Sequence, residues 1–569
     1  MIVGGKKVIV REVQQDIYQR LRGDGYSDAL ARVYAGRGAL PSSYLEKSIL
    51  RKEGLQQALQ AGEMLASHIM RGNVIALSID FDNDGQTAGA IVARAIRAFG
   101  GTINVYCPCR ETEGYGTNKR IVHQAKDDGC SVLLTCDNGI VAFDAVIEAK
   151  RLGMDVVITD HHLPDNSFKL PNADYIVNPW AERGESQFEG KNLCGAGVAW
   201  YVMACVKESL DRQGWKHTFT MKSVVDLLAC GTIGDMVKLD KLNLQLIRLG
   251  LEKLNSDDMN PGLQAILAVS GKSGAPVNSQ TIGFTLAPMI NSSSRLGSAE
   301  RATKLLVTED KAEAWQLATE LREVNNERKE LQKQMSELAM DSLAMDVGTH
   351  SACIFNPEFK VGIVGLVASK VKDMTNLPSG VFTRTGGGRL KGSMRSIPGV
   401  HIRDVLDLVK RKRPDIGLVG GGHQGAAGAS VDEDKWDVFK STFNEAVIEL
   451  ADSEAFNPTL VVDGSLSEAD ISMSMAEEIS SEIWGQGIPA PIFSGEIQIT
   501  DQKILNGAHC KFTGKIGRLM VQGIFFGRAH LLPPISNLVY SLDINVWNGN
   551  KSIQLLVQGI DESQEGLFA

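Results

Sequence analysis

Three carboxylates stand at alternate positions directly after an apolar run. Asp80, Asp82 and Asp84 follow the segment Val74–Ile79, and Gly85 comes next. Crowded carboxylates repel one another unless a cation neutralises them, and hard divalent ions such as Mg²⁺ and Mn²⁺ prefer oxygen ligands. The chemistry that this spacing favours is metal binding.

Two alternatives compete with a catalytic metal site for these acids. An EF-hand calcium loop also begins Asp-x-Asp-x-Asp-Gly, but it needs a glutamate at its twelfth position and a helix in front. The twelfth position here is Ile91, and a strand pattern precedes the acids, which excludes an EF-hand. A solvated acidic turn is the second alternative, and this segment alone leaves it open.

The elements around the acids predict an α/β fold. Val74–Ile79 is typical of a buried parallel strand, and the apolar spacing over residues 88–99 predicts a helix behind it. Further β-branched runs alternate with helical patterns at Ile103–Tyr106, Val132–Cys136 and Val156–Thr159. Such alternation predicts a parallel sheet, in which ligands bind at the carboxyl ends of the strands.

Four apolar segments end in acids or histidines. In chain order, Val74–Ile79 is followed by Asp80–Gly85, Val132–Cys136 by Asp137, and Val156–Thr159 by Asp160-His161-His162. The fourth segment, Val224–Cys230, runs through Gly231–Gly234 to Asp235. We expect all four ends at one edge of one sheet. Any one of these side chains could be a helix cap or a buried structural group, but the four together favour a site. Carboxylate and imidazole ligands without cysteine suit a pair of Mn²⁺ or Mg²⁺ ions.

These motifs, in this order, resemble those of the DHH phosphoesterases. Further motifs are similar to the RecJ branch of that family, the single-strand-specific 5′→3′ DNA exonucleases, at Leu193–Trp200, Pro288–Gly297, Gly392–Gly399 and Gly420–His423. The resemblance runs from about residue 30 to the C-terminus. It implies a Mn²⁺- or Mg²⁺-dependent enzyme, with two ions, that hydrolyses the phosphodiester bonds of single-stranded DNA from a 5′ end in recombination and repair. It also implies a helicase and a single-strand-binding protein as partners.

The resemblance further implies roles for individual residues. The metal ligands would be Asp80, Asp82, Asp84, Asp137, His161 and Asp235. Asp137 would be the bridging ligand, Asp160 would orient a neighbouring imidazole, and His162 would contact the scissile phosphate. The path of the substrate would be lined by Arg110, Arg295, Ser393, Arg395 and His423.

Three positions depart from the RecJ branch. Met394 stands where glycine is usual, Asn83 where a small residue is commoner, and Lys360 where histidine is usual. Because none of them is a proposed ligand, they affect substrate fit and rate more than the reaction class.

The predicted architecture is a series of α/β domains followed by an all-β barrel. It consists of an N-terminal helical segment (1–70), a parallel-sheet DHH domain (71–310), a connecting helix (311–345), a second, DHHA1-like α/β domain that binds substrate (346–452) and an OB-fold barrel (453–569). The connecting helix has a polar break at Arg328. In the barrel, Asn548-Gly549 between alternating runs indicates a hairpin.

Charge is unevenly distributed along the chain. Residues 376–415 contain nine Lys/Arg against three Asp, a local charge of +6, whereas the whole chain carries −9. This contrast favours a phosphate-binding face in the second α/β domain. The run Lys410–Arg413 is more typical of a solvated helix end, whereas Arg389, Lys391 and Arg395 lie among glycines, where a backbone can approach phosphate closely.

Composition predicts a cytoplasmic protein that does not enter a membrane. Hydrophobic residues make up 43% of the chain and charged residues 22%, the N-terminus lacks a signal-peptide pattern, and no apolar run reaches the length of a membrane span. The nine cysteines lack repeated zinc spacing, so we expect reduced thiols rather than a structural zinc site.

Two alternative functions differ from a DNA exonuclease. A non-catalytic DNA-binding or scaffold protein is disfavoured because the acids and histidines are intact. An enzyme for short oligonucleotides or cyclic dinucleotides is disfavoured because the C-terminal barrel is additional machinery for a longer strand.

Overall fold

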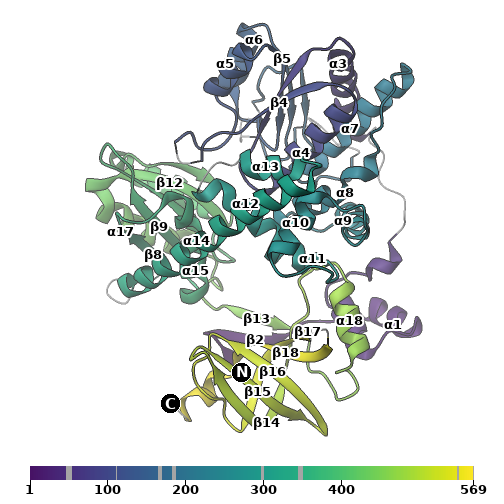
Figure 1. The fold of residues 1–569 in the computed structure, drawn as a ribbon. Helices are drawn as coiled ribbons and strands as arrows, with labels where there is room; N and C mark the ends of the chain where they lie inside the picture. The colour runs from purple at the N-terminus through teal and green to yellow at the C-terminus, as the bar shows by residue number, and fades with distance from the viewer. Residues whose placement is uncertain are drawn as a thin grey trace. The chain divides into compact units, whose positions relative to one another are not determined.

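The computed structural model describes residues 1–45, 54–110, 112–164, 169–181, 188–296, 300–343, 350–547 and 550–567 (Figure 1). The chain divides into two compact units. The first unit contains Ser42–Arg328 and Glu482–Pro489, and the second contains Met1–Pro41, Lys329–Ser481 and Ala490–Ala569. Among the described residues, no helix has the length and apolar character needed to cross a membrane. All nine cysteines are free thiols.

A parallel sheet forms the centre of the first unit, as predicted, and it has five strands. Its order is β4 (Thr102–Tyr106), β3 (Val74–Ile79), β5 (Cys130–Cys136), β6 (Asp155–Thr159) and β7 (Tyr175–Val177). Every neighbouring pair runs parallel. The sequence pattern did not indicate β7, because three residues are too few to show a period.

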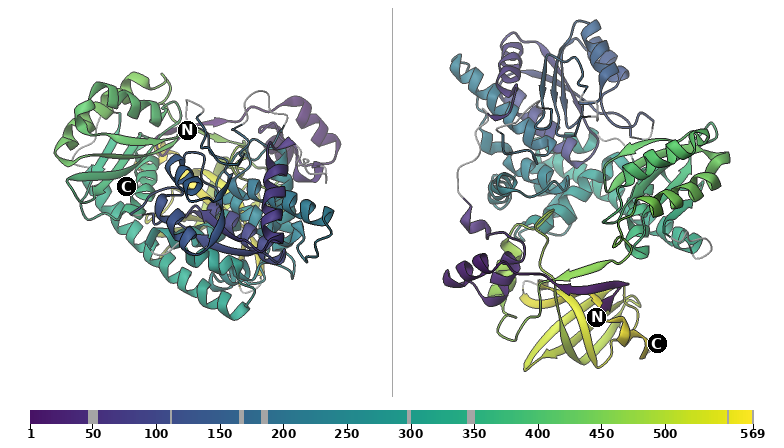
Figure 2. Two further views of the ribbon diagram at one scale, coloured as in Figure 1. Left: turned by 90° about the horizontal axis from the view of Figure 1, so that it is seen from above. Right: turned by 180° about the vertical axis from the view of Figure 1, so that it is seen from behind.

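Helices cover both faces of this sheet (Figures 1 and 2). One face carries α3 (Ala58–Met70), α4 (Asn83–Ala98) and α7 (Gly195–Arg212), and the other carries α5 (Lys119–Asp127) and α6 (Phe143–Arg151). The strand β3 alternates between the two cores, with Leu77 in one and Ala76 in the other. Burial on both faces explains why the strands are continuous apolar runs.

The fourth apolar segment is a helix, which corrects the prediction that it ends at the sheet edge as a strand. Residues Val225–Gly234 form α8, and Asp235 is its C-cap. The helix is buried on nearly every side, including Val225, Leu227 and Leu228. An apolar run of this length has no periodicity that separates a buried strand from a buried helix.

The rest of the first unit is helical. It comprises α9 (Lys241–Leu254), α10 (Pro261–Val269), α11 (Ser279–Thr281), the π-helix η4 (Ile282–Leu286), α12 (Ala287–Leu296) and α13 (Glu300–Val307). The expected long helix is α14 (Lys311–Leu343), and the two units divide within it, after Arg328.

The second unit contains the predicted second α/β domain. Its sheet has the order β11 (Val419–Gly422), β12 (Ala426–Asp432), β10 (Arg389–Arg395), β9 (Ser379–Arg384) and β8 (Ala352–Phe355). The helices of this domain are α15 (Val361–Thr375), α16 (Ile402–Lys412) and α17 (Trp436–Leu450). Buried Phe382, Phe439 and Phe443 form part of the core between sheet and helices.

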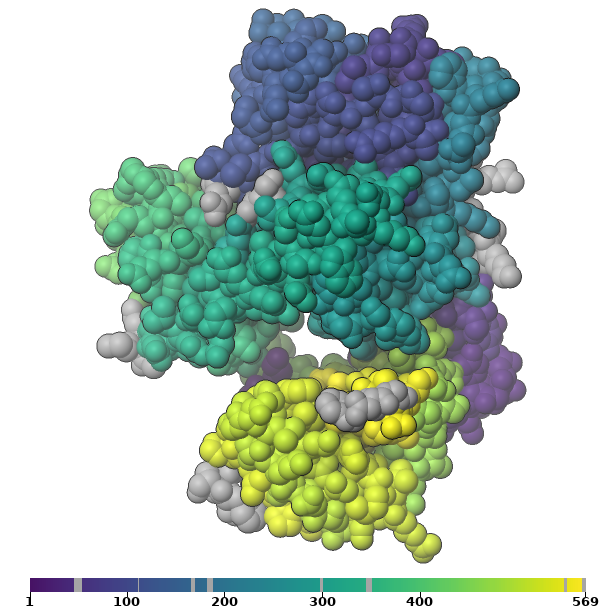
Figure 3. All heavy atoms as spheres, viewed as in Figure 1, coloured from purple at the N-terminus to yellow at the C-terminus, as the bar shows by residue number. Residues whose placement is uncertain are grey.

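A closed five-stranded barrel follows and confirms the OB-like architecture (Figure 1; its atoms are yellow-green to yellow in Figure 3). Its strands are β14 (Phe493–Leu505), β15 (His509–Ile516), β16 (Leu519–Phe526), β17 (Ile535–Trp547) and β18 (Asn550–Ile560). β17 and β18 pair antiparallel up to Trp547 and Asn550. The predicted turn residues Asn548 and Gly549 lie outside the described residues.

The prediction of a helical segment over residues 1–70 is wrong for the first ten residues. Helices α1 (Gln15–Gly23), α2 (Asp28–Ala35) and α3 are present, but β1 (Ile2–Val3) and β2 (Lys6–Val10) precede them. β2 pairs parallel with β13 (Thr459–Val462), a strand that precedes the barrel strands in the sequence. Such a pairing joins residues about 450 positions apart, so no local pattern at the N-terminus indicates it.

Candidate metal centre

Main-chain hydrogen bonds fix three of the predicted acids in one row at the carboxyl ends of the strands. The N–H groups of Asp80, Asp137 and Asp160 donate to the carbonyls of Cys136, Thr159 and Val177, at 3.3, 3.0 and 3.1 Å. Each acid thereby continues the bonding of its own strand to the next one. The three side chains therefore start from neighbouring points along a single edge of the sheet.

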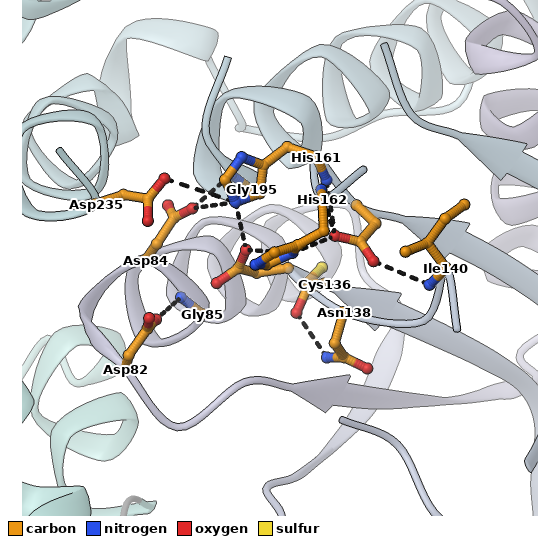
Figure 4. A network of polar contacts seen from close by, with 12 residues as sticks. Asp82, Asp84, Gly85, Cys136, Asn138, Ile140, His161, His162, Gly195 and Asp235 are labelled. Carbon is orange, nitrogen blue, oxygen red and sulfur yellow. Dashed lines mark hydrogen bonds and ion pairs between the residues drawn. The ribbon is translucent and has the colours of Figure 1, made fainter. Parts of the chain in front are cut away.

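The remaining two acids of the first motif belong to the start of α4 (Figure 4). Asp82 is the N-cap, and its Oδ1 accepts from the N–H of Gly85 at 3.0 Å. Asp84, in the first turn, accepts from the N–H groups of Gly195 and Ala196 at 2.5 and 2.9 Å. Because these donors open α7, Asp84 is held by the amino terminus of a second helix.

Asp137 has a backbone conformation that most residues avoid. Its φ is +61°, in the left-handed region where aspartate is more common than most residues. The first turn of α7 packs directly against it, since a Cβ on Gly195 would lie 2.5 Å from the Asp137 Cβ and 2.7 Å from Oδ1. Any larger residue at position 195 would collide with Asp137. Glycine is therefore required for the first turn of α7 to lie against both Asp137 and Asp84.

His161 brings the separate elements together. Its Nε2 lies 3.0 Å from Oδ1 of Asp137, 3.7 Å from Oδ2 of Asp84 and 3.6 Å from Oδ2 of Asp235. Three groups of side chains each place one potential ligand atom per residue within 4.8 Å of the others. They are Asp80, Asp82 and Asp137; Asp137, His161 and His162; and Asp84, His161 and Asp235. Asp137 and His161 each belong to two groups, so the three form one continuous constellation.

Keeping these buried carboxylates ionised costs free energy when no cation is bound. Burial, with the charge of Asp82 next, raises the pKa of Asp80 well above its ordinary value. Burial, followed by Asp84, does the same to the pKa of Asp137 and of Asp235. Buried carboxylates with raised pKa values need a cation to ionise together at neutral pH.

His162 is held by a carboxylate and a hydroxyl. Its Nδ1 lies 2.8 Å from Oδ1 of Asp160 and 3.0 Å from Oη of Tyr115. The Tyr115 hydroxyl donates its hydrogen to the carbonyl of Asp137. Both neighbours of Nδ1 are then acceptors, so Nδ1 carries a proton. Burial lowers the pKa of His162, but the bond to Asp160 and nearby acids outweigh it and raise the pKa to about 9.

Asp160 bonds the backbone of both histidines as well as the His162 ring. Its Oδ1 accepts from the N–H groups of His161 and His162 at 2.7 and 3.1 Å, and its Oδ2 accepts from Ile140 at 2.9 Å. Burial raises the pKa of Asp160, yet its bonds to His162 and the backbone lower it overall. Asp160 is therefore a charged carboxylate that bonds the His162 ring and the neighbouring backbone, and its orienting role stays a prediction.

Sequence reasoning missed the contacts of three polar residues that shape the site, Tyr115, Thr117 and Asn138. Tyr115, flanked by two glycines, contacts His162. Asn138 donates to the carbonyls of Ser78 and Cys136, and its Oδ1 accepts from Thr117 at 2.6 Å. Asn138 thus fixes the loop that carries Tyr115 to the ends of β3 and β5. The Gly114-Tyr115-Gly116 sequence was the available signal, since glycines allow close backbone approach.

The predicted substrate residues are divided between the two units. In the first unit, the Arg110 guanidinium lies 4.8 Å over the ring of Phe81 and interacts with the charges of Asp80 and Asp82. Arg295 is half-buried near the end of α12. Gly297, in the same motif, lies outside the described residues.

Ser393, Arg395 and His423 belong to the second unit. Nη1 of Arg395 donates to Oγ of Ser393 at 2.7 Å. A Cβ on Gly365 of α15 would lie 3.1 Å from both side chains, so they face that helix. His423 is exposed after β11. Met394 points to the opposite face of β10 and is fully buried, so this departure leaves the face of Ser393 and Arg395 unchanged.

Much of the local positive charge is neutralised within the second unit. Arg389 pairs with Asp432, Lys412 with Glu449 and Arg413 with Asp415. Lys410 donates to the carbonyl of Gly420 at 2.7 Å. The sequence suggested a solvated helix end for this run, and in the structure Lys412 and Arg413 at the end of α16 form ion pairs. Arg389 is engaged by its cross-strand neighbour.

The donors fit divalent ions. Oδ1 of Asp80 is buried and accepts no hydrogen bond from the described residues. Oδ1 of Asp137 and Nε2 of His161 lie 3.0 Å apart without the geometry of a hydrogen bond between them. Oxygen-rich groups with one or two imidazoles suit Mn²⁺ or Mg²⁺.

Comparisons with known proteins agree with this geometry. Residues 74–232 match the family model of the DHH family, N-terminal domain. Residues 348–449 match the DHHA1 domain and residues 462–559 the RecJ OB domain. The sheet, the metal-binding constellation and these matches define a DHH-type phosphoesterase architecture.

Curated relatives share most of the chain. The single-stranded-DNA-specific exonucleases RecJ of Salmonella typhimurium and Escherichia coli are each 34% identical over 553 residues, covering 93% of this chain and 95% of theirs. The chain belongs to the RecJ family of single-stranded-DNA-specific exonucleases.

Solved structures of RecJ proteins are also similar. The RecJ of Thermus thermophilus in complex with Mn²⁺ has a TM-score of 0.79 and 25% identity, over 98% of this chain and 79% of that one. An exonuclease RecJ bound to manganese has a TM-score of 0.58 and 30% identity, over 70% of this chain and 96% of that one.

Proposed function

We propose that this chain is a metal-dependent exonuclease that hydrolyses phosphodiester bonds of single-stranded DNA from the 5′ end. Its cofactors are two Mn²⁺ or Mg²⁺ ions. The observation that carries the proposal is the continuous constellation in which Asp137 and His161 each belong to two groups of ligand atoms. Shared ligands are what a pair of neighbouring ions requires.

The constellation suggests a division of ligands. Asp80, Asp82 and Asp137 would hold one ion, and Asp84, His161 and Asp235 the other, with Asp137 as the bridge. When bound, such ions activate water as a nucleophile and neutralise charge on the phosphate oxygens.

His162 and two arginines complete the site on the substrate side. The His162 ring is protonated near neutral pH and held through Nδ1, so its Nε2–H donates to a phosphate oxygen. Arg110, beside Asp80 and Asp82, offsets the charge of the strand, and Arg295 contacts the strand further along its path. Arginine suits this role because its fork matches two phosphate oxygens.

The second unit supplies the grip on the 5′ end. Ser393 and Arg395 lie side by side facing α15, and His423 follows β11. They are the phosphate contacts of the terminal nucleotide in our proposal. The 5′→3′ direction follows from the RecJ resemblance.

The partners follow from the substrate. Because only a single strand is degraded, a helicase must open a duplex first, and a single-strand-binding protein covers the exposed strand. We place this activity in the cytoplasm, in DNA recombination and repair.

Hydrolysis of end-labelled single strands tests the proposal. Linear strands labelled at either end and a circular strand are incubated with Mn²⁺, Mg²⁺ or a chelator. We expect metal-dependent release of label from 5′-labelled linear strands first, and none from circles or with chelator. Binding without hydrolysis would indicate a DNA-binding scaffold, and hydrolysis restricted to short oligonucleotides or cyclic dinucleotides would indicate the smaller-substrate class.

A further inference from the structure

Asn83 stands between two acids of the constellation, yet its side chain turns away from them. It is 1% exposed. Its Nδ2 donates to the carbonyl of Cys230 on α8 at 2.8 Å, and its backbone N–H donates to Oδ1 of Asn291 on α12 at 2.9 Å. Asn83 therefore ties the first turn of α4 to two other helices.

Gly234 provides the space that Asn83 fills. A Cβ at position 234 would lie 2.0 Å from Nδ2 and 2.7 Å from Cγ of Asn83. One turn earlier, a Cβ on Gly231 would lie 2.6 Å from Oγ1 of Thr87 and 2.9 Å from Oδ1 of Asp84. Helix α8 therefore approaches α4 to a distance that only glycine allows.

This contact is adjacent to two carboxylates of the site. Asp84 follows Asn83, and Asp235 follows Gly234. Their oxygens lie 3.7 and 3.6 Å from Nε2 of His161. Any change in the separation of α4 and α8 at this point moves Asp84 relative to Asp235.

We propose that Asn83 and Gly234 form a matched pair, a side chain and the space for it, that sets the separation of Asp84 and Asp235 and hence the affinity of this group for a divalent ion. Both are positioning residues. The inference rests on the proposed metal site.

A double-mutant cycle on Mn²⁺ binding tests the pair. Calorimetry below the melting temperature gives the Kd of the full chain for Mn²⁺ with no DNA present. We expect Gly234→Ala, which forces Asn83 out, and Asn83→Ala, which releases α8, each to raise the Kd about tenfold. The double variant is expected to bind at least as tightly as either single variant, because the new methyl group occupies the space that the amide leaves.

Two controls separate this inference from the proposed function. Gly283→Ala, whose Cβ would make an ordinary 3.7 Å contact with Ile233, should leave the Kd unchanged. Asp235→Ala should abolish part of the Mn²⁺ binding; if it binds as the natural chain does, the metal site itself is wrong.

The cycle has clear contrary outcomes. If the Kd of the double variant rises by the product of the two single-variant effects, the two residues do not act as a pair. If the single variants bind Mn²⁺ as tightly as the natural chain while Asp235→Ala does not, the pairing is overturned and the metal site stands. If Gly234→Ala does not fold, Asn83→Ala carries the test, and an unchanged Kd in that variant overturns the proposal.

Discussion

The hydroxyl of Tyr115 contacts two parts of the site at once. It donates to the carbonyl of Asp137 and lies against Nδ1 of His162, both at 3.0 Å. Tyr115→Phe removes both contacts and leaves the bond from Asp160 to hold Nδ1 of His162, so the imidazole is less firmly oriented. A typical hydrogen bond contributes about 0.5–1.5 kcal/mol, so we expect kcat on single-stranded DNA to fall roughly three- to tenfold, with a smaller change in KM.

A second tyrosine gives the matched control. Tyr106 bonds to Asp128 at 2.7 Å, at the outer edge of the sheet. Tyr106→Phe removes a comparable hydrogen bond and should leave kcat unchanged. Equal effects on kcat in the two variants would show that Tyr115 acts through stability alone.

The acids make the stability of the metal-free protein depend on pH. Burial, with Asp82 next, raises the pKa of Asp84 from 3.8 to about 6. A raised carboxyl pKa stabilises the fold below pH about 4, and this contribution is lost as the pH rises through about 6. The raised pKa of His162 acts in the same direction, with loss between about 6.5 and 9.

Thermal melting with chelator should therefore show a falling melting temperature as the pH rises from 4 toward 9. Saturating Mn²⁺ should flatten the dependence, because ions replace protons as the neutralising charge. Asp84→Asn, which is neutral throughout, should give a shallower slope between pH 4 and 7. An identical slope in Asp84→Asn would contradict the conclusion that Asp84 contributes to the pH dependence of stability.

At the scale of elements, the sequence predicted the strands that carry Asp80, Asp137 and Asp160, because continuous apolar runs between helical patterns are typical of buried parallel strands. It did not predict that α8 carries Asp235, because a short buried helix and a short buried strand share one composition. It also missed the contacts of Tyr115 and Asn83, since these depend on which loops and helices meet in three dimensions.

The N-terminal elements depend on one buried ion pair. Nη1 and Nη2 of Arg37 bond both oxygens of Asp463 at 2.7 and 2.9 Å, and the two side chains are 1% and 0% exposed. Arg11 bonds the same carboxylate. Arg37→Met leaves the buried Asp463 carboxylate with Arg11 as its remaining charged partner among the described residues, so it should destabilise the second unit by at most about 3–5 kcal/mol, the cost of an unpaired buried charge.

Thermal or denaturant unfolding measures this loss. The exposed pair Lys551–Glu477, at 3.3 Å in the same unit, gives the control. Lys551→Met should change stability by about 0–1 kcal/mol. A loss in Arg37→Met no larger than in Lys551→Met would mean that the N-terminal elements do not depend on Asp463.

At the scale of the whole molecule, the barrel is predicted to grip DNA rather than to perform chemistry. Phe526 is 59% exposed on β16 and packs edge-on against His509. A base stacked on an aromatic ring contributes about 1–3 kcal/mol, so Phe526→Ala should raise KM for a long strand roughly five- to hundredfold. Turnover of a very short oligonucleotide should stay unchanged.

Val546, 58% exposed on β17, provides the control, and Val546→Ala should leave KM unaltered. The same KM in Phe526→Ala and the natural chain would remove the barrel face from the DNA path. A point variant is sharper than cutting the chain near Ala455, because such a cut would also remove β13, the partner of β2.

The order of α/β domains and barrel followed from motif order and strand patterns. The division into compact units did not, because it depends on the long-range pairing of β2 with β13 and on Arg37 reaching Asp463. A sequence pattern records what each segment resembles, whereas these contacts depend on where distant segments meet.

The stoichiometry of Mn²⁺ binding tests the central claim most directly. Calorimetry on the natural chain and on Asp137→Asn, with folding checked by circular dichroism, gives the number of ions bound. Since Asp137 belongs to two of the three ligand groups, we predict two ions per natural chain, and at most one in the variant with loss of hydrolysis. Two ions bound by a fully active Asp137→Asn variant would contradict the account.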